Sequence, residues 1–198
     1  MTDVAFRDAD IRTGDIWTPS AALLELPAKS APGPVSAPEI VGTESGGGLP
    51  QCEIIDMNFG VHVMDNLIKE HHLTPAGAAA LAGNFVEDSH LHLDGSGNGG
   101  FGLAGWMAPQ RVDLMRQFCA ANHLAPDSVE GQMAFLIKEM ERQNPNLLQA
   151  LRTTNDAAGA ALRYRQEFAR PGVPDTCYGR QDSAREFMQL YEKQHHQG

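Results

Sequence analysis

From Asp56 to the C-terminus, apolar residues recur three and four positions apart, and one glycine-rich segment, residues 90–105, interrupts the pattern. Residues at this spacing share one face of an α-helix, whereas a strand would require alternation. The first stripe ends around His71 and His72 and comprises Val61, Met64, Leu67 and Ile68. The pattern predicts a mainly α domain with one small β or loop insertion.

Capping residues divide the rest of this region into helices. Ser, Thr, Asp and Asn are preferred before a helix, and proline suits its first turn. The glycine-rich segment suits a loop or a small hairpin turning at Gly99 and Gly100. The expected helix starts are Thr74 with Pro75, Pro109, Asp127 with Glu130, Pro145, and Asn155 or Asp156 for a helix running to Phe168. Two later apolar faces comprise Met133, Leu136, Ile137 and Met140, and then Ala184, Phe187, Met188 and Tyr191.

Residues 1–50 differ from the remainder in composition. They contain six prolines and the run Gly46, Gly47 and Gly48, and such a segment buries little apolar surface. We therefore expect an extended attachment arm, followed by a globular domain over residues 51–198. Within the arm, Ile16 to Leu26 is more apolar than a simple linker, so it is expected to dock either on a partner or on its own domain.

Charge and targeting signals exclude several classes of protein. The formal net charge is -10, whereas nucleic acids and anionic membranes require clustered Lys and Arg, so we expect neither as a partner. No signal peptide is evident, because acids occupy the N-terminus and no apolar run follows. The three cysteines, Cys52, Cys119 and Cys177, form no CxxC pair, and no cofactor is expected.

Glu87 is the candidate general acid. On a helix it shares a face with Ala80, Gly83 and Asn84, and it lies at the helix end just before the glycine-rich segment. We expect this small-residue face to line a cleft. The negative end of the helix dipole should raise the pKa of Glu87, as suits an acid that stays protonated near neutral pH. The alternative is an ordinary solvated glutamate at a helix end.

The order of several motifs resembles the phage tail lysozyme family. GNFVEDS is followed by GFGLAGW and APQRVDLM, and then by GQMAFLIKEM, RYRQEFARPG and RQDSAREFM. The resemblance covers residues 56–192 and leaves the arm unmatched. It implies a lysozyme-like helical domain, distantly similar to goose-type lysozyme and lytic transglycosylases. Such a domain cuts the β-1,4 bond between N-acetylmuramic acid and N-acetylglucosamine in peptidoglycan.

The resemblance also implies site residues. The catalytic acid of the family falls on Glu87. In two places the chain departs from the family pattern: Gly105 replaces a glutamine, and Asp88 stands between the acid and the following serine. The implied substrate-binding residues are Asn84, Ser89, Gly100, Gly102 and Trp106.

A glycosidase normally requires a second carboxylate, about 5 Å from the acid for a nucleophile or about 6.5 to 9.5 Å for a base that activates water. We predict Asp94, which lies in the glycine-rich segment, because Asp88 projects about 100° around the helix from Glu87. If neither is placed suitably, the 6-hydroxyl of the muramic acid could attack instead. The protein would then be a lytic transglycosylase that needs Glu87 alone.

Two other hypotheses stay open. His90 and His92 form an HxH pair that, with Asp94, offers zinc ligands, although surface histidines often occur in this pattern by chance. A structural tail or adaptor protein with a degenerate lysozyme fold would need no catalytic residue. The leading expectation is a muramidase in the virion tail or delivered to the bacterial periplasm. Its expected partners are peptidoglycan and, through the arm, a phage tail or secretion-machine protein.

Overall fold

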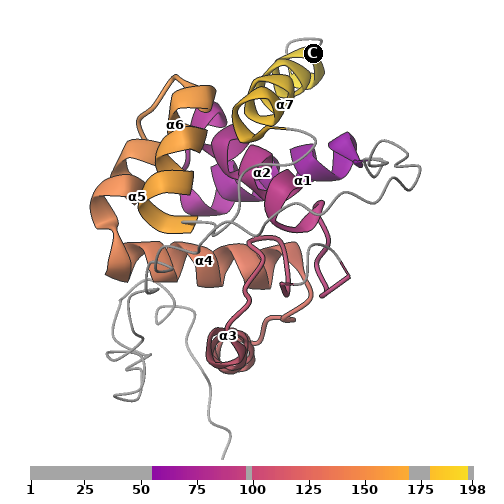
Figure 1. The fold of residues 1–198 in the computed structure, drawn as a ribbon, viewed down its shortest axis with the longest axis vertical. Helices are drawn as coiled ribbons and strands as arrows, with labels where there is room; N and C mark the ends of the chain where they lie inside the picture. Colours follow the sequence, from indigo (N-terminus) through magenta and orange to yellow (C-terminus); the bar gives the residue numbers. More distant parts are fainter. Residues whose placement is uncertain (1–54, 97–99, 170–178, 196–198) are drawn as a thin grey trace, which may run out of the picture. The chain divides into compact units, whose positions relative to one another are not determined.

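A computed structural model describes residues 55–96, 100–169 and 179–195, and the domain in these ranges is mainly helical (Figure 1). The arm, the domain boundary at residue 50, Gly99, Cys52 and Cys177 lie outside the described residues. The helices are α1 (Met57–His71), α2 (Pro75–Ser89), α3 (Pro109–Ala121), α4 (Val129–Gln143), α5 (Pro145–Leu151), α6 (Ala157–Tyr164), the π-helix η2 (Arg165–Ala169) and α7 (Arg180–His195).

Most helix starts follow the capping pattern of the sequence. Thr74 caps α2 by accepting the Gly77 N–H, and Asp156 caps α6 by accepting the Gly159 N–H. The start expected at Asp127 was one residue early. Ser128 is the last extended residue, with φ -110° and ψ 156°, so its side chain is the one that reaches the free N–H groups of the first turn.

Two expected boundaries also shift. The helix expected to reach Phe168 is α-helical to Tyr164 and π-helical over Arg165–Ala169. In the described part of the glycine-rich segment, one isolated antiparallel bridge pairs Phe101 with Trp106. Its turn lies over residues 102–105, where glycines adopt positive φ, rather than around Gly100.

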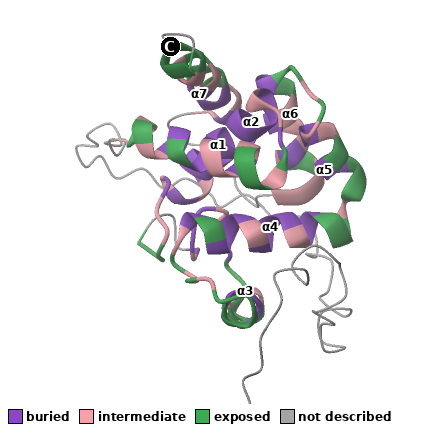
Figure 2. Ribbon diagram, turned by 180° about the vertical axis from the view of Figure 1, so that it is seen from behind, coloured by how far each residue is buried: buried purple, intermediate pink, exposed green. Residues whose placement is uncertain are grey.

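Helix α2 is the centre of the domain. It packs against α1, α5, α6 and α7, and its small side chains allow close approach on several sides (Figure 1). Thirteen of its fifteen residues are buried, and Figure 2 shows this concentration beside the mixed exposure of the surrounding helices. The free energy of burying Leu81, Phe85 and Val86 therefore contributes to fixing the helix whose C-terminal end carries Glu87. No helix in the described ranges is long and apolar enough to cross a membrane.

Candidate active site

Glu87 lies near the C-terminal end of α2 and is 6% exposed. Its Oε1 accepts a hydrogen bond from the backbone N–H of Gly179 at 2.8 Å. Gly179 immediately precedes α7, so the residue before this helix holds one oxygen of the carboxyl group in place. A buried polar group is stable only with such a partner, and the contact therefore fixes the position of the candidate acid.

Arg180 fixes the same junction through its side chain. It is 4% exposed, and its Nη1 donates to Asp88 Oδ1 at 2.8 Å and to Asn84 Oδ1 at 3.0 Å. The Asn84 amide in turn donates to the backbone oxygens of Ala80 and Ala161. Asp88 and Asn84 thus join the start of α7 to α2, and Asn84 also joins α6 to α2. The sequence argument missed this role of Arg180, the first residue of α7.

The small-residue face of α2 does not line an open cleft along its length. A Cβ atom on Gly83 would lie 2.6 Å from the backbone N of Ala184 and 2.6 Å from the backbone O of Arg180. The backbone of α7 therefore occupies the space that the small side chains leave. The cleft predicted along Ala80, Gly83 and Asn84 was wrong, because small residues admit a neighbouring helix as readily as they admit a ligand.

The glycine-rich segment packs directly against the end of α2. The hydroxyl of Ser89, which is buried, lies 3.0 Å from the Leu103 backbone oxygen and 3.1 Å from that of Phe85. Gly105 has φ +55°, and a Cβ there would lie 2.8 Å from the Asp88 backbone oxygen. Glycine at this position therefore allows the loop to touch the last turn of α2, which carries Glu87.

Trp106 is 2% exposed and belongs to a buried polar network. Its Nε1–H donates to Glu139 Oε2 at 3.0 Å, and Arg111 pairs with both oxygens of Glu139 at 3.0 and 2.8 Å. Burial opposes the charge on Arg111, but the hydrogen bonds and charge of Glu139 raise the pKa of Arg111. Burial also raises the pKa of Tyr164, and the charge of Asp88 adds to that rise. Glu139 and Arg111 therefore hold the Trp106 ring in a fixed position within the core.

Asp94 has the opposite environment from Glu87. It is exposed, and its Oδ1 accepts hydrogen bonds from the Ser96 hydroxyl and, at 2.9 Å, from the Ser96 backbone N–H. These hydrogen bonds lower the pKa of Asp94, so its side chain is a carboxylate at neutral pH. Glu87 is thus a buried carboxyl group on a helix, and Asp94 is an ionised carboxylate on an exposed loop.

His90 forms the C-terminal cap of α2. His90 ends α2 in the left-handed conformation with φ 52°, and its N–H caps the backbone oxygens of Phe85 and Val86. No group of three or more His, Cys, Asp or Glu side chains in the described ranges could hold a metal ion. Within these ranges, His90, His92 and Asp94 are not gathered into such a group. Cys119 is buried, and burial raises the pKa of its thiol to about 11.

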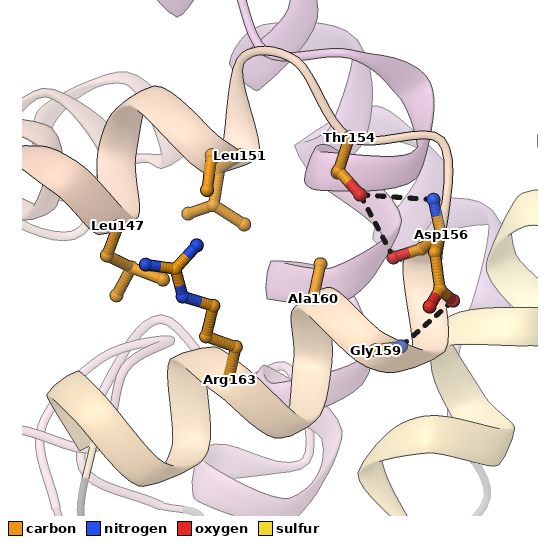
Figure 3. Close-up of a pocket in the computed structure, with 8 residues that line it drawn as sticks. Leu147, Leu151, Thr154, Asp156, Gly159, Ala160 and Arg163 are labelled. Atoms are coloured by element: carbon orange, nitrogen blue, oxygen red, sulfur yellow. Dashed lines mark hydrogen bonds between the residues drawn. The ribbon is translucent and has the colours of Figure 1, made fainter.

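A separate cavity of about 170 Å³ lies between α5 and α6, and none of the predicted site residues lines it (Figure 3). Asp156 caps α6 at one edge of the cavity, while the side chain of Arg163 extends toward Leu147 (Figure 3). The residues lining the cavity are Leu147, Ala150, Leu151, Thr154, Asp156, Gly159, Ala160 and Arg163.

The described residues form a mainly helical domain. Its central helix carries a buried glutamate near its C-terminal end and is followed by a glycine-rich loop with an exposed aspartate. The profile of the phage tail lysozyme family matches residues 61–191, and the chain belongs to this family. Neither a curated protein nor a solved structure is similar enough to match the chain. The family confirms the resemblance found in the motifs and indicates a lysozyme-like domain that acts on peptidoglycan.

Proposed function

We propose that this protein is a muramidase in which Glu87 is the general acid. One observation carries the proposal: the Glu87 carboxyl group is buried at the end of α2 and held by the Gly179 N–H, beside the glycine-rich loop. A carboxyl group in such a place is oriented before substrate arrives, and orientation supplies much of the rate enhancement of an enzyme. Family membership supports peptidoglycan as the substrate.

In the proposed reaction, Glu87 donates its proton to the glycosidic oxygen as the bond from C1 of N-acetylmuramic acid to that oxygen breaks. The oxygen leaves as the 4-hydroxyl of N-acetylglucosamine. Positive charge develops at C1. If the ionised Asp94 attacks this carbon, a water that Glu87 deprotonates then cleaves the resulting glycosyl ester; if Asp94 instead removes a proton from a water, that water oxygen bonds to C1 directly. The lowered pKa of Asp94 suits both roles, because each requires a carboxylate.

The remaining predicted site residues fall into two groups in this proposal. Gly100 and Gly102 allow the loop to pack closely, since a Cβ on Gly100 would lie 2.5 Å from the Gly105 backbone and one on Gly102 would lie 2.6 Å from Gln132 Oε1. Asn84, Ser89 and Trp106 are fully or almost fully buried and hydrogen-bonded to protein atoms, so we propose that they serve the site by fixing α2 and the loop.

We propose that the enzyme is carried by a phage tail, or delivered to the periplasm by a related machine, with residues 1–50 as the attachment arm. The family description supports the tail. Comparing the full chain with residues 51–198 on isolated peptidoglycan tests the arm. Similar turnover supports an attachment role, and higher turnover of the shorter chain would show inhibition by the arm.

The decisive experiment compares the wild type with Glu87→Gln on purified peptidoglycan, with products identified by mass spectrometry. Glu186→Gln, the same substitution at an exposed residue of α7, is the matched control. We expect new reducing muramic acid ends from the wild type and Glu186→Gln, and a rate at least about 100-fold lower from Glu87→Gln. Treatment with EDTA should change none of these rates.

Other products would identify the alternatives. Anhydromuramic ends would establish a lytic transglycosylase, and peptide fragments would exclude both glycosidase mechanisms. If the folded wild type and Glu87→Gln are equally inactive on several peptidoglycans, the structural tail or adaptor hypothesis stands instead.

A further inference from the structure

Gln132 is a buried and fully hydrogen-bonded polar side chain beside the glycine-rich loop. It lies in α4 and is 0% exposed. Its Oε1 accepts the Leu103 N–H at 2.8 Å, and its Nε2 donates to the backbone oxygens of Leu93 at 2.7 Å and Pro126 at 3.0 Å. Both amide protons and the carbonyl oxygen are thus used, which offsets the cost of burying the group.

These bonds connect two parts of the glycine-rich loop to one helix. Leu93 lies in the first part of the glycine-rich segment and Leu103 lies in its turn, while Pro126 belongs to the connection between α3 and α4. Backbone groups in a loop otherwise form hydrogen bonds with water or with each other. A single buried side chain that bonds to both Leu93 and Leu103 holds these two residues at a fixed separation.

The loop is shaped to receive this side chain. Gly102 has φ +70°, and a Cβ there would lie 2.6 Å from Gln132 Oε1. The Gly102 N–H donates to the Asp94 backbone oxygen at 3.0 Å. Gln132 therefore binds the backbone oxygen of Leu93, the residue before Asp94. It also lies against Gly102, whose N–H binds the backbone oxygen of Asp94 itself.

We propose that Gln132 is a positioning residue that sets the place of Asp94 relative to Glu87. The inference rests on the proposed function, since it assumes that Asp94 takes part in the reaction. The Asp94 side chain is exposed and bonded only to its neighbour Ser96 among the contacts described, so its place depends on its backbone. The backbone in turn is held by Gln132. A displacement of about 1 Å in such a group lowers turnover by about 100-fold.

The test is a double-mutant cycle in the full chain. Gln132→Met keeps the size of the side chain and removes all three hydrogen bonds, and Gln143→Met is the same substitution at the exposed end of α4. We expect Gln132→Met to lower kcat about 10- to 100-fold with little change in KM, and Gln143→Met to leave both unchanged. In an Asp94→Asn background, Gln132→Met should change kcat less than about twofold, because the group that it positions is already disabled.

A general structural role of Gln132 gives a different result, since it would lower kcat by the same factor in both backgrounds. That outcome overturns the proposal, as does a kcat of Gln132→Met equal to that of Gln143→Met. If Gln132→Met fails to fold, Gln132→Glu replaces it in the same cycle, since it retains an acceptor for the Leu103 N–H but loses donors to the two carbonyl oxygens.

Amide hydrogen exchange separates this proposal from the proposed function. The Leu103 and Gly102 amides should exchange about tenfold faster in Gln132→Met than in Gln143→Met, whether or not the protein is active on peptidoglycan. Unchanged exchange at Gly102 would overturn the positioning role by itself. Inactivity of the wild type, with faster exchange in Gln132→Met, would instead remove the proposed function and leave Gln132 as the residue that holds the loop.

Discussion

The two candidate carboxyl groups are held in opposite ways. Glu87 belongs to a helix buried on almost every side, and the start of α7 binds it through the Gly179 N–H. Asp94 lies exposed on a loop that is bonded to α4 through the backbone oxygen of Leu93 and the backbone N–H of Leu103. The domain therefore places one group by core packing and the other by a few hydrogen bonds.

This difference predicts which substitutions should lower the stability of the fold and which should lower the activity alone. Substitutions around the end of α2 disturb a buried ion pair and the core, so they should cost free energy of unfolding. Substitutions at the exposed part of the loop leave the core intact, so they should change turnover with little effect on stability. The following experiments test this contrast.

Arg180→Met should have the largest effect. It leaves the Asp88 carboxylate at the buried end of α2 without its guanidinium, which costs about 3–5 kcal/mol of the free energy of unfolding. Chemical denaturation measures the loss. Arg185→Met removes an exposed pair with Asp182 and should cost less than about 1 kcal/mol. A loss in Arg180→Met as small as in this control would mean that the ion pair does not hold α7 to α2.

Asp94→Asn should show the reverse behaviour. We expect turnover on peptidoglycan to fall about 100-fold, because the carboxylate that supports the developing charge is lost. The free energy of unfolding should change by less than about 0.5 kcal/mol, since the side chain is exposed. Asp113→Asn, at an exposed position of α3, should leave both quantities unchanged. Normal turnover in Asp94→Asn would remove Asp94 from the mechanism.

Gly105→Ala tests the contact between the two regions. The positive φ of Gly105 and the close Asp88 backbone oxygen predict a loss of about 1–2 kcal/mol in thermal or chemical unfolding. Gly95→Ala is the control in the same loop, because a Cβ there meets nothing within 4 Å. Equal stability of the two variants would show that the loop does not depend on its approach to α2.

Ser96→Ala should have the smallest effect, and it tests what lowers the pKa of Asp94. The Ser96 hydroxyl contributes most to lowering the pKa of Asp94 from its ordinary value of 3.8, so its removal should raise that pKa and move the acid limb of the activity profile upward. A carboxyl group whose pKa is lower in the folded than in the unfolded state stabilises the fold at pH values above its unfolded-state pKa. This stabilisation is lost as the pH falls through the folded-state pKa. Carbon-13 NMR titration of Asp94 measures the change, and an unshifted pKa would exclude the hydroxyl as its cause.

Local sequence rules determined most of the helical framework. Spacing of apolar residues and the caps at Thr74 and Asp156 gave the correct elements, because these signals act within a few residues. The same rules placed Glu87 at the end of a helix and before a glycine-rich loop. They also supplied the ordered motifs whose resemblance the family match over residues 61–191 confirms.

Tertiary structure decided what each side chain near the site meets. The distances in sequence are large: 92 residues separate Asp88 from Arg180, and 29 separate Leu103 from Gln132. A small-residue face on α2 was equally compatible with a cleft and with a packed helix, and only the fold showed that α7 occupies it. Gln132 and Glu139 stand seven residues apart in α4, which put both on one face, but nothing local indicated which loop atoms they would bind. Helix formation is a short-range property of the chain, whereas the partners of a buried polar group depend on which distant segments the hydrophobic core brings together.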